Sequence, residues 1–236
     1  YRMPHDFMSN LAHEYDSPKG DFGIFVGEYA VTRGTTRYGS LRAAIGEAAF
    51  MLGLERNQDQ VKLAAYAPLF ANAQHIVWTP NMIYPTTDGS FVSPSWTVQK
   101  LFSENRGTEV LQVGVKTDAI ELTRFRAWEN RVQTNVIDCV QASAMRTADG
   151  GIVLKLVNCA ETPKRVEVRG LSGKVRRTVF TGPHRDAHNS PFEPEALKES
   201  VSDFPLPGSD ILPPLSLVIY SQKGTGRQVT ISNCGN

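Results

Sequence analysis

Glu28 is the first residue of the chain whose type and position suggest chemistry. It comes directly after residues 22–27, a short and nearly continuous apolar run that is typical of a parallel strand buried on both faces. A carboxylate at the carboxyl end of such a strand lies where the active sites of βα barrels are built. A glutamate in a solvent-exposed loop would give the same local sequence, and it is the commoner case in an arbitrary chain.

A second candidate site is the loop of residues 78–84, which follows another apolar segment. The rings of Trp78 and Tyr84 could stack on a sugar, and the amide of Asn81 could hydrogen-bond to its hydroxyls. The same aromatic side chains could equally pack the loop itself. These residues alone leave both interpretations open.

No other motif supports a metal ion or an organic cofactor, and we expect neither. His184 and His188 have the spacing of a helical metal pair, but they lie in a Gly- and Pro-flanked loop without the accompanying Glu, which indicates a solvated loop. Gly224-x-Gly226 precedes no phosphate-loop Lys, and the Gly-x-Ser-x-Gly motif of α/β-hydrolases is absent. Three cysteines are too few for a Cys₄ zinc site, and at least one of them is unpaired. Cys139 and Cys159 could pair across strands, but we expect small buried apolar side chains at Cys139, Cys159 and Cys234.

The composition of the 236 residues excludes two classes of protein. Lys and Arg number 25 and Asp and Glu 24, so the net charge of +1 lacks the basic excess of a general nucleic-acid binder. No apolar run approaches the ~20 residues that span a bilayer. We therefore expect neither a nucleic acid nor a membrane as a partner.

Helices and strands alternate over residues 4–106 and would position both candidate sites. A short helix is predicted over residues 6–15, a second buried strand over 63–70, a long loop over 72–91, and a helix that opens at Ser93-Pro94. Strand, loop and helix in this order are typical of parallel βα units, so Glu28 and the 78–84 loop should lie on one face. The clearest helix is Leu41–Arg56 with Ser40 as its N-cap, because one apolar stripe contains Leu41, Ala44, Ile45, Ala48, Ala49 and Leu52.

After Gly107 the apolar period changes to two, which predicts an antiparallel β-sandwich. Residues 182–207 lack this period and are predicted to be a long irregular loop. The expected division is therefore into residues 1–108, with βα units, and residues 109–236, with the sandwich. The strands are predicted at residues 110–115, 119–128, 135–141, 152–158, 165–169, 175–181 and 215–221.

Two βα units are too few to close a barrel or fill a doubly wound sheet. The chain also opens on Tyr1-Arg2-Met3-Pro4, without an initiator Met or a signal region. Both observations predict that the chain is a piece of a longer polypeptide.

The sequence resembles the α-L-arabinofuranosidases of glycoside hydrolase family 51 over essentially its whole length. The resemblance is most specific between Val26 and Phe102, and it is looser downstream, where Leu212-Pro213-Pro214 precedes the last strand. The matching segments are Tyr1-Arg2 with Pro4, Phe7 and Asn10; Phe25-Val26-Gly27-Glu28-Tyr29-Ala30; Gly39-Ser40-Leu41 with Ala43-Ala44-Ile45 and Glu47-Ala48-Ala49-Phe50; Leu54-Glu55-Arg56-Asn57; Ala65-Tyr66-Ala67-Pro68-Leu69-Phe70; Trp78-x-Pro80-Asn81-x-Ile83; and Pro94-Ser95-x-x-Val98-Gln99.

This resemblance implies a retaining glycosidase in which a catalytic (β/α)₈ barrel is followed by a jelly-roll-like β-sandwich. Residues 1–108 would be the last βα units of the barrel, and Glu28 matches the catalytic nucleophile at the end of its seventh strand. Tyr1 matches a tyrosine in a substrate-side loop, although its preceding His is absent here. The substrate-binding residues implied are Tyr1, Tyr29, Trp78 and Asn81.

The acid/base of the family is a Glu directly after an Asn, far upstream of the nucleophile. None of Glu14, Glu47, Glu55 and Glu104 matches that motif, so none is assigned, and this chain alone is expected to be inactive. The missing N-terminal part of the barrel is therefore an implied partner, and a homo-oligomer is a possible assembly. Tyr29-Ala30-Val31 is typical of the branch with secreted plant, fungal and gut-bacterial enzymes, which favours a secreted or periplasmic location.

The activity implied is the removal of terminal α-L-arabinofuranosyl residues from arabinoxylan or arabinan, without a cofactor. The alternative from another class is a non-catalytic carbohydrate-binding or scaffold fragment. A related barrel-plus-sandwich glycosidase with another pentose or hexose preference is a third interpretation.

Overall fold

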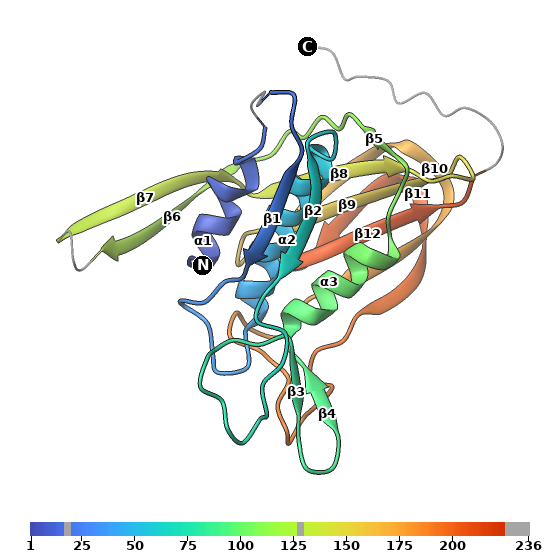
Figure 1. Cartoon of the computed structure of the whole chain (residues 1–236). Coiled ribbons are helices and arrows are strands. Elements are labelled where there is room, and N and C mark those ends of the chain that lie inside the picture. The colour runs from blue at the N-terminus through green and yellow to red at the C-terminus, as the bar shows by residue number, and fades with distance from the viewer. Residues whose placement is uncertain (17–19, 127–129, 225–236) are drawn as a thin grey trace.

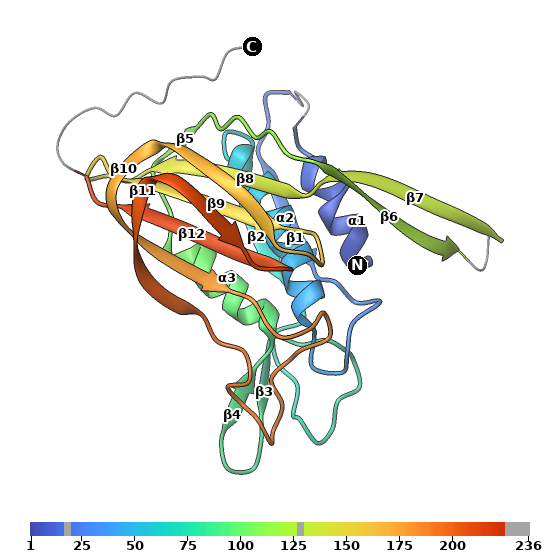
Figure 2. The same cartoon turned by 180° about the vertical axis from the view of Figure 1, so that it is seen from behind.

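The computed structural model describes residues 1–16, 20–126 and 130–224, so Cys234 and Gly226 lie outside the described residues. Helix α2 (Leu41–Arg56) lies between a parallel pair of strands and a large antiparallel sheet (Figures 1 and 2). None of the helices in these ranges is long and apolar enough to cross a membrane.

Helix α2 has the predicted bounds. The Ser40 hydroxyl accepts a hydrogen bond from the amide of Ala43 at 3.2 Å, so the predicted N-cap is confirmed. The predicted helix over residues 6–15 is instead split into α1 (Pro4–Met8) and a 3₁₀ turn, η1 (Leu11–His13). Both short elements pack against α2.

Strands β1 (Ile24–Tyr29) and β2 (Val61–Tyr66) are parallel neighbours joined through α2, which confirms the βα pattern. The second strand ends before the predicted limit of residue 70, because Pro68 has no amide to donate to a strand. The expectation that β1 is buried on both faces is wrong for this chain. Phe25 and Leu63 each have 63% of their surface exposed, since the described residues form no closed barrel around the pair.

Helix α3 (Pro94–Glu104) begins at the predicted Ser93-Pro94, and Ser93 caps the amide of Trp96. The predicted loop over residues 72–91 contains a short hairpin that the sequence did not indicate. It is formed by β3 (Ile83–Pro85) and β4 (Ser90–Val92) and projects beyond the N-terminal end of α3 (Figure 1).

The large sheet has the strand order β11-β10-β12-β9-β8-β5. Strand β9 has the predicted bounds, whereas the two strands predicted over residues 165–181 form one strand, β10, with a bulge between Val168 and Gly173. The predicted loop over 182–207 is wrong from residue 200 onward, where β11 runs along the edge of the sheet. The bounds are β5 (Glu109–Leu111), β8 (Val140–Arg146), β9 (Ile152–Asn158), β10 (Lys164–Phe180), β11 (Ser200–Leu212) and β12 (Ser216–Gln222), with a separate hairpin of β6 (Ala119–Arg126) and β7 (Arg131–Asp138).

The alternation along β9 shows how the sheet is buried on both sides. Val153 and Val157 belong to the hydrophobic cluster on the α2 and α3 side, and Ile152, Leu154 and Leu156 belong to a second cluster on the other side. The second cluster is closed by β10 and β11, which curve over the sheet and contribute side chains such as Val168 and Leu206 (Figure 2). The result is the all-β sandwich, and its first face is covered by helices.

A continuous core joins the parts before and after residue 108. Leu52 of α2 and Phe102 of α3 share one cluster with Leu217 and Ile219 of β12. The division at residue 108 falls in the turn between α3 and β5, and as a boundary between two domains it stays a prediction.

Candidate active site

Glu28 lies at the exposed carboxyl end of β1, and the Tyr1 hydroxyl donates a hydrogen bond to its Oε2 atom at 2.6 Å. The neighbouring Arg2 brings Tyr1 to this position, because it forms a parallel bridge with Val31 and accepts a hydrogen bond from the Thr32 amide at 3.2 Å. The pKa of the Tyr1 phenol is raised, mainly by the hydrogen bond to Glu28. The phenol therefore keeps its proton and remains a hydrogen-bond donor to this carboxylate.

Trp78 lies beside Tyr1 in the loop that follows β2. The two ring centroids are 6.3 Å apart in an edge arrangement, and 57% of the Trp78 surface is exposed. The structure therefore brings together three of the predicted site residues, a carboxylate, a phenol and an exposed indole ring, from three separate segments of the chain.

Asn81 lies in the same loop, but it is only 2% exposed. Its side-chain amide donates to the carbonyl of Trp78, and its backbone amide donates to the Tyr84 hydroxyl at 2.6 Å. Tyr84 is stacked on Phe91 of β4 within a buried aromatic cluster. These contacts anchor the loop that carries Trp78, so the role that the structure shows for Asn81 is to hold this loop in place. A contact between Asn81 and a sugar stays a prediction.

Tyr29 points to the opposite face of β1 from Glu28, as successive residues of a strand do. Its ring is buried at 5.0 Å from Phe50 of α2, and its hydroxyl is hydrogen-bonded to the side chain of Gln99 in α3. Burial is the main cause that raises the pKa of Tyr29. The structure thus places Tyr29 in the layer beneath the strand, and its predicted contact with substrate stays untested.

Glu47 is a buried carboxylate close to this site that sequence reasoning did not single out. It lies in α2, and its Oε1 atom accepts the amide hydrogen of Val31 at 2.8 Å. Burial raises its pKa to about 7, against the opposing effects of Ser95, Val31 and Tyr66. The signal that could have revealed it is an acidic residue enclosed by the apolar run Ala43-Ala44-Ile45-Gly46-Glu47-Ala48-Ala49-Phe50.

Metal binding finds no support in the described ranges, where no group of three or more His, Cys, Asp or Glu residues could hold an ion. Cys139 and Cys159 are free thiols buried in the sandwich, as expected for small apolar side chains. Burial raises the pKa of the Cys159 thiol, which disfavours the reactive thiolate.

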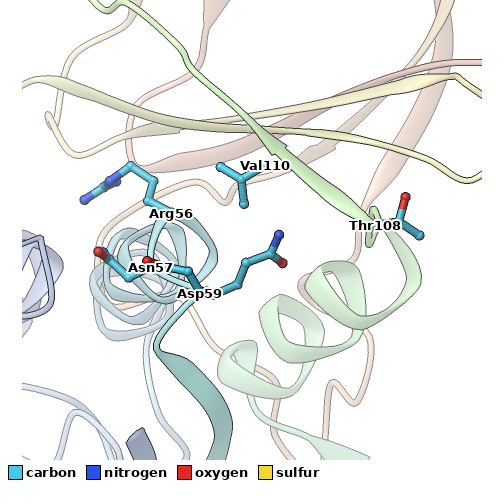
Figure 3. Close-up of a pocket in the computed structure, with 6 residues that line it drawn as sticks. Arg56, Asn57, Asp59, Thr108 and Val110 are labelled. Atoms are coloured by element: carbon cyan, nitrogen blue, oxygen red, sulfur yellow. The ribbon is translucent and has the colours of Figure 1, made fainter. Parts of the chain in front are cut away.

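A polar hollow of about 530 Å³ opens at the other end of the parallel strands (Figure 3). It lies between the end of α2, the turn into β2 and the start of β5, and its lining includes Arg56, Asp59 and Val110. Arg56 and Asp59 precede the start of β2 whereas Trp78 follows its end, so the hollow is separate from the grouping around Glu28.

Comparison with known proteins defines the class of this chain. Residues 27–216 match the sequence model of the α-L-arabinofuranosidase C-terminal domain. The chain therefore belongs to this family, the family of the arabinofuranosidases of glycoside hydrolase family 51.

Three curated relatives illustrate the match. Alpha-L-arabinofuranosidase 2 of Arabidopsis thaliana is 35% identical over 159 residues, 66% of this chain and 23% of the relative. Alpha-L-arabinofuranosidase 1 of the same plant is 32% identical over 215 residues, 89% of this chain and 30% of the relative. An extracellular exo-alpha-L-arabinofuranosidase of Streptomyces chartreusis is 42% identical over 112 residues, 47% and 13% of the two chains. The chain thus spans less than a third of the length of these relatives.

Solved structures confirm the fold. An arabinose-bound GH51 α-L-arabinofuranosidase superposes with a TM-score of 0.78 at 24% identity, over 94% of this chain and 36% of that one. The arabinose complex of the α-L-arabinofuranosidase from Thermotoga maritima gives a TM-score of 0.72 at 18% identity, over 85% and 43%. Both likenesses concern a C-terminal part of the fold.

Proposed function

We propose that this chain is the C-terminal part of a retaining exo-α-L-arabinofuranosidase, with residues 1–108 completing its catalytic barrel and residues 109–236 forming its sandwich. The family membership supports the substrate class, because the relatives are named arabinofuranosidases. The observation that carries the proposal is the hydrogen-bonded pair of Tyr1 and Glu28 beside the exposed Trp78 ring. Such a group offers a fixed carboxylate and an aromatic surface for a sugar.

In this proposal Glu28 attacks the anomeric carbon of a terminal arabinofuranosyl residue. A bond forms between a Glu28 oxygen and that carbon while the bond to the leaving oxygen breaks, and the leaving oxygen receives a proton from a second carboxyl group. Water then opens the glycosyl-enzyme ester, with its proton passing to that second group. Tyr1 holds Oε2 of Glu28 by its hydrogen bond, which leaves Oε1 to react.

The second carboxyl group should lie about 5–5.5 Å from Glu28, as in retaining glycosidases generally. We assign it to a segment upstream of this chain, as part of the remaining barrel. The exposed face of β1 and β2, with Phe25 and Leu63, supports this assignment because the remaining strands of a closed barrel would cover that face. Arabinoxylan and arabinan are the proposed polymeric substrates.

Replacement of Glu28 in the complete enzyme tests the proposal. We expect Glu28→Ala to lower turnover of a nitrophenyl α-L-arabinofuranoside by several powers of ten, because the covalent step is lost. Glu104→Ala is a matched control, since Glu104 is exposed at the end of α3. Turnover of Glu28→Ala within about tenfold of wild type would remove the nucleophile assignment. NMR of the first product should show retained configuration, and an inverted product would exclude the retaining mechanism.

The second candidate function is carbohydrate binding without catalysis. It is favoured by the exposed Trp78 ring beside Tyr1, which offers a sugar an aromatic surface whether or not a reaction follows. Affinity electrophoresis of the 236-residue chain in gels with and without arabinoxylan separates the two. Two results together would favour binding: the chain is retarded by arabinoxylan without hydrolysing it, and the complete protein is inactive as well.

A further inference from the structure

A buried polar cluster lies behind the carboxyl ends of β1 and β2, and the proposed chemistry does not use it. Its members are Glu47 of α2, Tyr66 of β2 and Ser95 of α3, which we call the Glu47 cluster. The hydroxyls of Tyr66 and Ser95 interact with the Glu47 carboxyl, although neither hydroxyl nor Oε2 of Glu47 has a hydrogen-bond partner of good geometry. Only Oε1 is firmly engaged, by the Val31 amide.

Val31 connects this cluster to Glu28 by two routes. Along the chain, Val31 is three residues beyond Glu28. The side chains of Ala30 and Val31 are fully buried, so this stretch of backbone is held in place. Through space, Val31 bridges with Arg2, and the adjoining Tyr1 donates its hydrogen bond to Glu28. Whatever fixes the Val31 amide therefore fixes both the carboxylate and its hydrogen-bond donor.

We propose that Glu47 is a positioning residue for Glu28, acting through its hydrogen bond from Val31. This inference rests on the proposed function, in which Glu28 attacks the sugar. The Val31 amide is buried, so no water can take the place of the Glu47 oxygen as its acceptor. Loss of that oxygen would therefore release the segment of residues 28–32 from α2. A displacement of about 1 Å at a reacting group can lower a rate by about a hundredfold.

Three substitutions in the complete enzyme separate positioning from simple folding. Glu47→Gln keeps an oxygen for the Val31 amide, and Glu47→Leu removes it. Glu47→Asp keeps a carboxyl group, but its side chain is one methylene shorter, so the oxygen lies farther from the Val31 amide. Glu55→Gln is the matched control, because Glu55 lies on the same helix and binds Lys155 far from Glu28. The measurements are kcat and KM on a nitrophenyl arabinofuranoside, and the thermal midpoint of each variant.

We expect Glu47→Leu to lower kcat about tenfold to a hundredfold with KM changed less than about threefold, and Glu47→Gln to stay within about threefold of wild type in both. The control should lower the thermal midpoint and leave kcat unchanged. A folded Glu47→Leu enzyme with wild-type kcat would overturn the inference, as would a Gln variant as slow as the Leu variant. If Glu47→Leu does not fold, Glu47→Asp must be slower than Glu47→Gln, and equal rates overturn the inference.

The Glu28→Ala variant distinguishes failure of the Glu47 inference from failure of the proposed function. If Glu28→Ala is inactive while every Glu47 variant is fully active, only the role of Glu47 is lost. If Glu28→Ala is itself active, the proposed function fails and the Glu47 inference fails with it.

Discussion

The Nζ atom of Lys155 lies 2.6 Å from Oε1 of Glu55, which links strand β9 to the last turn of α2. Lys155 is 0% exposed, and its ammonium also donates to the carbonyl of Asn105 at 2.6 Å. Burial lowers the pKa of Lys155, and the Glu55 carboxylate opposes that shift. The helical layer and the sandwich are therefore joined by a buried ion pair as well as by a shared apolar core.

This pair predicts an asymmetric loss of stability. Glu55→Gln leaves the Lys155 charge buried without its counter-ion, so we expect the free energy of unfolding to fall by about 3 kcal/mol. Lys155→Met should cost less, because the freed Glu55 carboxylate keeps its hydrogen bond from Ser143 and some contact with solvent. Denaturant unfolding of both variants and of the double variant measures the coupling, and independent effects that simply add would contradict the prediction.

Tyr1→Phe tests the hydrogen bond to Glu28 with little change in shape. A hydrogen bond to a charged group contributes about 1.5–3 kcal/mol, which corresponds to a fall in kcat of about 10- to 100-fold if the bond persists in the transition state. The thermal midpoint should hardly change, because the Tyr1 ring is partly exposed. Steady-state kinetics check this prediction, and an unchanged kcat would mean that the phenol does not assist Glu28.

Glu47 predicts a dependence of stability on pH. Its pKa is raised to about 7 in the folded protein from 4.5, so the folded state binds this proton more tightly than the unfolded state. The corresponding stabilisation is fully present below pH 4.5 and is lost as the pH rises to about 7, by roughly 3 kcal/mol in total.

Glu47→Gln should remove that dependence, because an amide does not titrate. The difference in unfolding free energy between wild type and Glu47→Gln, measured at intervals from pH 4.5 to 8, isolates this group from the other titrating residues. Curves that stay parallel over this range would contradict the raised pKa.

Replacing Trp78 and replacing Phe91 should have opposite effects, one on substrate binding and the other on stability. Trp78→Ala should raise KM for arabino-oligosaccharides and leave the thermal midpoint unchanged, because more than half of the ring surface is exposed. Phe91→Ala should lower stability by about 3–5 kcal/mol, because its ring is buried in the cluster with Tyr84. A destabilised Trp78→Ala variant with normal KM would show that the ring packs the loop.

The sequence predicted best those elements whose pattern is local. Helix α2 has its expected bounds because a 3.6-residue apolar period and the Ser40 cap are both contained in the segment. Strand β9 is likewise a single uninterrupted apolar run. The candidate site was predicted in part, because Glu28, Tyr1 and Trp78 do meet, but the orientation of Tyr29 depends on which face α2 covers.

Strand β11 was missed because non-local pairing overrides its sequence. Pro205, Pro207 and Gly208 are poor strand residues, and they are tolerated because β11 pairs with β10 on one side only, at the edge of the sheet. The break expected between the strands at 165–169 and 175–181 is a bulge within β10, where Gly170 and Gly173 have φ values of 85° and 79°. The pairing register with β11 shifts there, and β10 continues beyond the shift.

Gly53 of α2 predicts a substitution whose sign opposes helix propensity. Replacing glycine by alanine within a helix ordinarily adds about 1 kcal/mol of stability. A Cβ atom at Gly53 would lie 2.2 Å from the carbonyl oxygen of Ala12, because η1 packs directly on the helix backbone. Gly53→Ala should therefore lower the free energy of unfolding by about 1–3 kcal/mol.

Gly46→Ala provides a graded comparison on the same helix. Its Cβ would lie 2.9 Å from the Pro4 carbonyl oxygen, a milder conflict, because α1 packs there less closely than η1 does at Gly53. We expect Gly46→Ala to cost less than Gly53→Ala, with both midpoints of denaturant unfolding below that of wild type. A Gly53→Ala variant more stable than wild type would mean that η1 moves aside, and the packing of the N-terminal segment that holds Tyr1 would then have to be looser than the structure shows.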